Sequence, residues 1–215
     1  MDLGDFAAVA AWSEAALRQF PADPAFVLAR AIADHRLGRR SHPPNQSPRG
    51  GTQTRGLLFD KRLPEIAPLS ASIRTAIEGA LARFTPDPAH PFLSRLTPGV
   101  DFAGSWSIRL RSAGFHQNHI HHSGWLSSAC QVALPPEVLP PEVTVPGATT
   151  GEPLPGRLVF GVPDAALGLD LAPRRIVRPA SGTLALFPSY FWHGTAPFES
   201  ASPRLTVAFD ALPSG

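Results

Sequence analysis

Residues 183–210 read TLALFPSYFWHGTAPFESASPRLTVAFD. The stretch begins and ends with short apolar runs, 183–187 and 204–210, whose Leu, Val, Phe and Thr side chains favour β-strands. Between the runs, proline, glycine and serine interrupt any regular element. The pattern predicts a strand at each end of the stretch, with His193 between them and Arg204 at the start of the last strand.

The same strand pattern extends back to Phe102. Apolar or alternating runs and two weaker strand signals bring the total to about eight, at 105–110, 115–121, 124–134, 156–161, 174–179, 183–187, the end of FPSYFWH, and 204–210. No helical pattern separates them, so we predict a mainly β fold of the jelly-roll (double-stranded β-helix) type with α-helices at the N-terminus. Residues 135–155 are rich in proline, which cannot donate to a ladder, and are expected to form an excursion between strands.

Two helices are predicted ahead of the β region. Apolar residues repeat at helical spacing over 5–19 and again over 26–37, with Pro21 and Pro24 between them. This pair resembles the junction between consecutive tetratricopeptide repeats, but a stack needs roughly three repeats to support itself. We therefore prefer a helical cover on the main domain over a peptide-binding repeat surface.

Three units follow from these patterns. Residues 1–41 are predicted to form a helical appendage, residues 42–56 a polar linker rich in glycine and proline, and residues 57–215 the main domain.

A third helix is predicted at the start of the main domain. It is expected to begin near Ser70 or Ser72 and to end before Pro86. Four apolar residues share one face of it: Ile73, Ile77, Leu81 and Phe84.

The composition excludes several classes of protein. With 215 residues the chain has room for one sizeable domain and an appendage. Its 19 basic and 17 acidic residues leave a formal net charge of +2, which does not indicate a nucleic-acid partner. The single Cys130 excludes an internal disulfide, no basic region precedes the first apolar stretch, and no apolar run approaches the roughly 20 residues that cross a bilayer. We expect a cytoplasmic protein without a membrane partner.

Five of the 8 histidines lie in two places, His193 and the run FHQNHIHHSGW at 115–125. Residues two apart on a strand point to the same face, so His119 and His121 can present two imidazoles to one point. A distant third ligand is normal for a mononuclear metal site. The cluster by itself is compatible with a zinc site, another metal site, or a histidine-rich loop.

Ten residues separate His193 from Arg204, and Thr206 follows two positions later. This H-x10-R-x-[ST] spacing, with the runs SWSIRLRSAGFHQNHIHHSGWLSSACQVALP and GRLVFG, resembles a bacterial subgroup of 2OG-Fe(II) oxygenases. The resemblance covers roughly residues 57–215. It implies that His119, His121 and His193 hold Fe(II), and that Arg204 and Thr206 anchor the co-substrate 2-oxoglutarate. A buried dicarboxylate needs a fixed bidentate cation, which a guanidinium supplies better than an ammonium.

The chain departs from the family pattern at two positions. His121 stands where most relatives carry an Asp or Glu ligand, which leaves an all-histidine set or a two-histidine set with His121 outside it. Gln131 stands where relatives commonly have a tyrosine, and its amide can also bind the co-substrate. Asn118, beside the histidine pair, is a further candidate for cofactor binding.

The resemblance implies a dioxygenase (hydroxylase) that uses Fe(II), 2-oxoglutarate and O2 and forms succinate and CO2. Its substrate would be an unidentified small molecule or protein, since the segments that would select it carry no readable code, and the sequence is silent on oligomeric state. Two alternatives come from other classes of protein. One is a non-catalytic metal- or ligand-binding jelly roll, because this fold hosts many unrelated functions. The other is a protein-interaction module with a degenerate oxygenase core.

Overall fold

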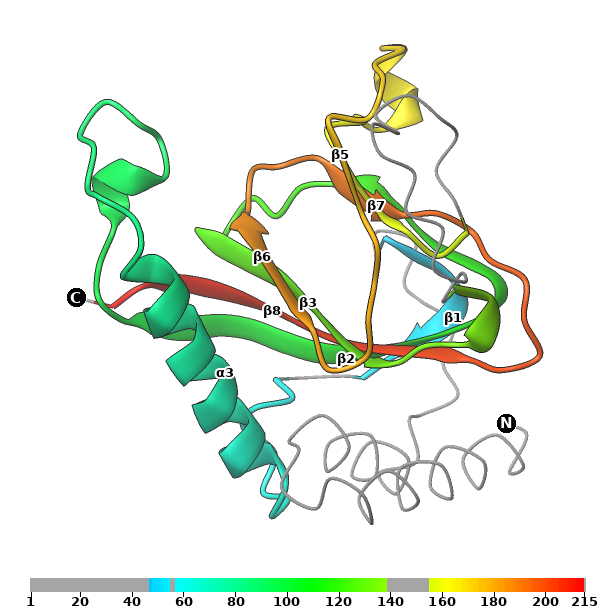
Figure 1. The fold of residues 1–215 in the computed structure, drawn as a ribbon, viewed down its shortest axis with the longest axis horizontal. Helices are drawn as coiled ribbons and strands as arrows, with labels where there is room; N and C mark the ends of the chain where they lie inside the picture. The colour runs from blue at the N-terminus through cyan, green and yellow to red at the C-terminus, as the bar shows by residue number, and fades with distance from the viewer. Residues whose placement is uncertain (1–46, 55–56, 139–154, 215) are drawn as a thin grey trace.

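The computed structural model describes residues 47–54, 57–138 and 155–214. The predicted N-terminal helices and most of the proline-rich excursion lie outside the described residues, so the division into an appendage, a linker and a main domain stays a prediction. The described part holds one sheet of eight strands and one α-helix (Figure 1). Their bounds are β1 Pro48–Gln53, α3 Ile66–Leu81, β2 Val100–His119, β3 Leu126–Ala133, β4 Leu158–Phe160, β5 Arg175–Val177, β6 Leu184–Pro188, β7 His193–Thr195 and β8 Arg204–Pro213.

Strand β2 pairs with three other strands, β1, β7 and β8. Its first half, from Val100 to Leu110, pairs with β8, and its last residues pair with β7. All pairs are antiparallel, and the strand order is β5-β4-β7-β2-β8-β3-β6 with β1 added to β2. The sheet curls into a half-barrel (Figure 1). Phe160 of β4 and Phe187 of β6, which lie far apart in the strand order, pack edge to face with ring centroids 4.9 Å apart. The mainly β prediction is confirmed, and the curled sheet is consistent with a jelly roll.

Side chains alternate between the two faces of the sheet from Arg204 to Asp210 of β8. Leu205, Val207 and Phe209 point to the outer face, where they join the main core cluster. Arg204 and Thr206 point to the inner face and line a cavity there. The period of two therefore divides this strand into a stabilising side and a side available for chemistry.

Helix α3 covers the outer face. Its residues Ile66, Leu69, Ile73, Ile77 and Leu81 recur every three or four positions and are all buried. They pack against the outward side chains of β3 and β8. Within the described ranges, no helix is long and apolar enough to cross a membrane.

The helix differs from its predicted bounds at both ends. It begins at Ile66 rather than near Ser70, because Pro68 lies in the first turn, where its missing N–H would have no partner in any case. Burial of Ile73, Ile77 and Leu81 confirms most of the predicted face. The prediction for Phe84 is wrong, since the helix ends at Leu81 and the Phe84 ring is exposed.

Two predictions about the strands are corrected. Pro48–Gln53, inside the expected linker, forms β1 and pairs with β2. The sequence PRGGTQ lacks the apolar alternation of a central strand because β1 pairs along one side only, and proline is tolerated on edge strands. The runs expected at 105–110 and 115–121 are parts of one strand, β2.

Candidate metal and anion site

A narrow cavity of ≈ 50 Å³ lies on the inner face of the sheet, between β2, β7 and β8. Three histidines line it, together with the inward residues of β8. His119 is the last residue of β2, His121 follows two residues later, and His193 is the first residue of β7. The register pairs His119 directly with His193, so antiparallel pairing brings together residues 74 positions apart in the chain.

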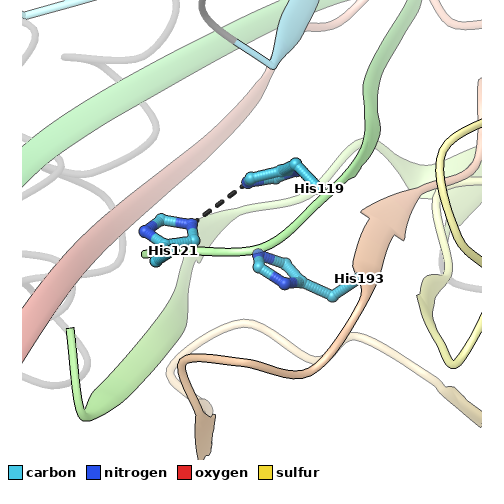
Figure 2. A group of neighbouring side chains, drawn as sticks. All are labelled: His119, His121 and His193. Carbon is cyan, nitrogen blue, oxygen red and sulfur yellow. Dashed lines mark hydrogen bonds between the residues drawn. The ribbon is translucent and has the colours of Figure 1, made fainter. Parts of the chain in front are cut away.

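The three imidazoles converge on one point (Figure 2). One ring nitrogen from each of His119, His121 and His193 lies within 4.8 Å of the other two. The ring centroid of His193 is 4.2 Å from that of His119 and 5.1 Å from that of His121. His121 lies beyond the end of β2, yet its ring reaches the same point as that of His119.

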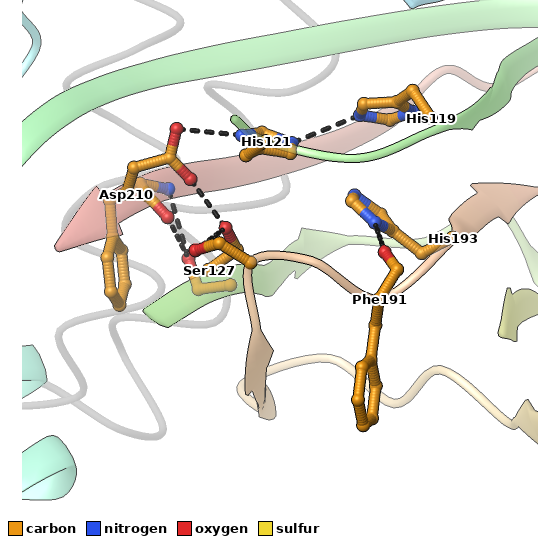
Figure 3. Close-up of polar contacts among 9 residues, drawn as sticks. His119, His121, Ser127, Phe191, His193 and Asp210 are labelled. Atoms are coloured by element: carbon orange, nitrogen blue, oxygen red, sulfur yellow. Dashed lines mark hydrogen bonds and ion pairs between the residues drawn. The ribbon is translucent and has the colours of Figure 1, made fainter. Parts of the chain in front are cut away.

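Hydrogen bonds on the far side of the His119 and His193 rings assign their protons, and Figure 3 shows the one between His193 and Phe191. The Nδ1 atom of His119 lies 2.7 Å from the carbonyl oxygen of Gln117, and that of His193 lies 2.9 Å from the carbonyl oxygen of Phe191. A carbonyl can only accept, so both Nδ1 atoms carry the proton and donate it. In each of these two neutral rings Nε2 is then unprotonated, and its lone pair faces the common point.

Burial keeps these two rings neutral. It lowers the pKa of His119 to about 4 and that of His193 to about 3, and the neighbouring histidines add to both effects. Phe187 contributes to the burial of His193, with ring centroids 4.6 Å apart. At neutral pH neither imidazole carries a charge that would repel a metal cation.

The contact between His119 and His121 shows what the site requires. Their Nε2 atoms are 3.1 Å apart. The single proton of His119 is on Nδ1, and a neutral His121 that donates its proton from Nδ1 to Asp210 has none on Nε2, so the two rings would direct lone pairs at each other at this distance. A cation between the rings, or an extra proton on His121, removes that repulsion. Three imidazole nitrogens around one point form a donor set that suits a divalent transition metal, so the residues fit the Fe(II) that the resemblance implies.

His121 has a different partner from the other two histidines. Its Nδ1 atom lies 2.7 Å from Oδ2 of Asp210 on β8. The other oxygen of Asp210 accepts a hydrogen bond of 2.6 Å from the Ser127 hydroxyl. The indole of Trp106 stacks on the His121 ring at 5.8 Å with planes 9° apart. The orientation of His121 is therefore fixed from two sides.

Arg204 lines the same cavity and is its buried cation. Its side chain is 2% exposed, and burial lowers its pKa to about 10, which still leaves it charged at neutral pH. It donates to the carbonyl oxygen of Gly156 at 2.5 Å and to Oε1 of Gln131 at 2.8 Å. Both partners are neutral, although buried charges are normally paired.

Two buried polar atoms beside this cation are unpaired. Among the described residues, neither Nε of Arg204 nor the hydroxyl of Thr206 has a hydrogen-bond partner. A buried donor without a partner costs about 1–3 kcal/mol. A carboxylate in the cavity would satisfy both groups and neutralise the guanidinium.

The structure separates the other two predicted cofactor-binding residues. Gln131 does not line the histidine cavity, but its Oε1 accepts a hydrogen bond from Arg204 and so helps to position the guanidinium. Asn118 is not among the residues that line the histidine cavity. It borders a different cavity of ≈ 470 Å³ with Val159 and Val162, and its amide donates to the carbonyl oxygen of Pro163 at 3.4 Å.

The sequence interpretation missed Asp210 and Ser127. Asp210 was predictable from the sequence RLTVAFD, because it lies an even number of residues from Arg204 and Thr206 and therefore faces the same side of the strand. No such signal existed for Ser127, since its role depends on the pairing of β3 with β8 opposite Asp210.

Comparison with known proteins agrees with this geometry. Residues 104–210 match a family model described as "Putative 2OG-Fe(II) oxygenase". The matched segment contains all three histidines together with Arg204 and Thr206. No curated protein matches the chain significantly.

Several solved structures are similar to the chain at low identity. HygX from Streptomyces hygroscopicus, with nickel and 2-oxoglutarate bound, is 11% identical with a TM-score of 0.50, covering 87% of this chain and 78% of that one. OsALKBH1 is 14% identical with a TM-score of 0.50, covering 87% and 92%. A Pseudomonas putida prolyl-4-hydroxylase is 16% identical with a TM-score of 0.47, covering 91% and 89%. The first two share the fold of this chain, and the family match makes residues 104–210 similar to the 2OG-Fe(II) oxygenases.

Proposed function

We propose that this protein is an Fe(II)- and 2-oxoglutarate-dependent dioxygenase that hydroxylates a small molecule or a protein. One observation carries the proposal: a convergent set of three imidazoles and a buried, unneutralised guanidinium line the same cavity. The first group is suited to a metal cation and the second to a carboxylate. 2-Oxoglutarate has the chemistry that engages both, because it is a dicarboxylate with a keto oxygen.

Each residue has a distinct part in the proposal. His119, His121 and His193 would hold the iron through Nε2, with their Nδ1 protons fixed by Gln117, Asp210 and Phe191. Arg204 and Thr206 would bind the distal carboxylate of 2-oxoglutarate. Gln131 and the Gly156 carbonyl would hold the guanidinium in place.

Bound iron would supply the activation of O2, with one oxygen atom entering the substrate and the other entering succinate as CO2 leaves. The chain's own contribution is to orient the ligands and to exclude water from the inner cavity. A further hollow of ≈ 290 Å³, bordered by Gln53, Trp106 and His122, is also lined by His119 and His121. We place the substrate in this hollow, because the hollow borders the metal ligands and is not lined by Arg204.

The test uses the metal-loaded protein and 2-oxoglutarate itself. Calorimetric titration of 2-oxoglutarate into anaerobic Ni(II)-loaded protein should show one site. Arg204→Ala should abolish this binding and retain Ni(II), because Arg204 is not one of the residues that would bind the metal. Arg111→Ala, at an exposed position on β2, is the matched control and should bind normally. Equal 2-oxoglutarate affinity in wild type and Arg204→Ala would refute the proposal.

A non-catalytic metal-binding jelly roll is the second candidate, and the all-histidine ligand set favours it. Three histidines also suit zinc, with an open fourth position. In that case the wild-type protein would bind Zn(II) and show no affinity for 2-oxoglutarate. Succinate formation with Fe(II), O2 and 2-oxoglutarate would decide for the oxygenase.

A further inference from the structure

Asp210 makes contacts that differ from those of a typical surface carboxylate. Its side chain is 17% exposed and both of its oxygens have partners. Oδ2 lies 2.7 Å from Nδ1 of His121, and Oδ1 accepts from the Ser127 hydroxyl at 2.6 Å (Figure 3). The Ser127 and Ser189 hydroxyls are 2.8 Å apart, and the backbone N–H of His121 donates to the Ser189 carbonyl at 2.9 Å.

These contacts tie three parts of the fold to His121. Asp210 comes from β8, Ser127 from β3 and Ser189 from the turn between β6 and β7. Gly124 leaves room for the Ser189 hydroxyl, because a Cβ atom at this position would lie only 2.5 Å from it. The carboxylate is therefore held in one position before any metal arrives.

Asp210 also makes His121 electrostatically different from its neighbours. His119 and His193 donate to neutral backbone carbonyls, whereas His121 faces an anion. A carboxylate behind a metal-binding imidazole raises the basicity of the nitrogen that binds the metal. His121 is thus built to be the most strongly donating of the three.

The charge of the site supports the same conclusion. A divalent ion with two histidines and one carboxylate carries a net charge of +1, as in the usual ligand set of non-haem Fe(II) oxygenases. Three neutral imidazoles would leave +2. Adding the charge of Asp210 returns the total to +1.

We propose that Asp210 is a positioning residue that provides, through His121, the negative charge absent from the ligands themselves. This inference rests on the proposed function, since it assumes that the three histidines bind a divalent metal. It concerns the metal affinity of this chain and not the identity of the substrate.

The test is the affinity for Co(II), measured by competition with a chelator and by the visible absorption of the bound ion. Asp210→Asn keeps the size of the side chain and removes its charge. We expect it to bind Co(II) about 10–100-fold more weakly than wild type, the range found when such supporting partners are lost. Asp101→Asn, an exposed position on β2, removes the same charge elsewhere and should change nothing.

Two further measurements separate positioning from simple structural support. The melting temperature of metal-free Asp210→Asn should stay near that of wild type, so that the loss is confined to metal binding. Should that variant not fold, Ser127→Ala keeps the charge but frees the carboxylate, and should weaken Co(II) binding about threefold. Unchanged Co(II) affinity in the folded variant would overturn the inference.

The two proposals fail in different ways. Wild-type protein that binds no Co(II) would overturn the metal site and this inference together. Wild-type protein that binds Co(II), with an Asp210→Asn variant that binds it equally well, would overturn the role of Asp210 alone.

Discussion

The Nε2 atoms of His119 and His121 lie 3.1 Å apart, and the only proton of the His119 ring is on its opposite nitrogen. This relationship makes the pair costly as two neutral side chains and well suited to a shared cation. His193, paired with His119 across β2 and β7, supplies the third nitrogen.

Replacing a ligand should abolish metal binding. His119→Ala and His193→Ala each remove one of three nitrogens, and we expect Ni(II) affinity to fall by more than the roughly 10–100-fold typical for a supporting partner. His122→Ala is the matched control, because His122 is exposed and outside the triad. Isothermal titration measures all three variants. Loss of binding in the His122 variant, with retention in the others, would assign the site to different residues.

Lowering the pH should destabilise the metal-free protein. The pKa values of His119 and His193 in the folded chain are about 4 and about 3, below the ordinary value of 6.5, so the unfolded chain binds more protons in acid. The stabilisation by the two neutral rings should be complete above about pH 6.5 and should decrease as the pH falls to about 4 for His119 and about 3 for His193, by up to about 1.4 kcal/mol per pH unit for each histidine. Urea unfolding at several pH values in a chelator measures this.

The control for the pH effect is His193→Gln, which removes one of the two groups. Its unfolding free energy should fall less steeply with decreasing pH than that of the wild type. Parallel curves for the two proteins would show that His193 does not contribute.

A charge placed beside Arg204 should compete with the co-substrate. Gln131→Glu would turn a 2.8 Å hydrogen bond into an ion pair and neutralise the guanidinium. We expect 2-oxoglutarate to bind at least about tenfold more weakly, equivalent to 1.4 kcal/mol, while the melting temperature of the co-substrate-free protein rises. Calorimetry and thermal melting measure the two effects.

Gln117→Glu provides a matched comparison for that variant. Gln117 accepts a 2.8 Å hydrogen bond from Arg49 outside the Arg204 cavity, and its amide donates to Oδ2 of Asp164 at 2.7 Å, so Gln117→Glu adds the same charge at a distance from Arg204 but also places it beside a second carboxylate. Its 2-oxoglutarate affinity should equal that of wild type. An equal loss in both variants would argue against a direct role for Arg204.

Helix α3 should stabilise the sheet through its buried face. Ile77 is fully buried in the main core cluster, so Ile77→Ala should cost about 2–5 kcal/mol of unfolding free energy. Glu78→Ala, one residue further on the exposed face, should cost less than about 0.5 kcal/mol. Chemical denaturation compares the two, and similar values would mean that α3 does not cover the sheet.

The strands were predictable where their side chains alternate. In RLTVAFD the period of two is visible because one face meets the helix and the other lines a cavity. Strand β1 was not predictable, because its polar, glycine-rich sequence pairs only along the side of β2. The start of α3 was missed because prolines in a first helical turn look like breaks.

The sequence predicted that particular side chains gather in one place, and the structure brings them to one cavity. These are His119, His121, His193, Arg204 and Thr206. The contacts that hold those residues in place could not be predicted from the sequence, because the contact between Asp210 and His121 joins positions 89 residues apart. Such a contact depends on strand register and leaves no local pattern in the sequence.

The most direct test of the central claim is a crystal structure grown anaerobically with Fe(II) and 2-oxoglutarate. We expect one iron bound by the Nε2 atoms of His119, His121 and His193, with 2-oxoglutarate extending from the metal to Arg204. A metal bound at other residues, or a dicarboxylate that does not contact Arg204, would contradict the account.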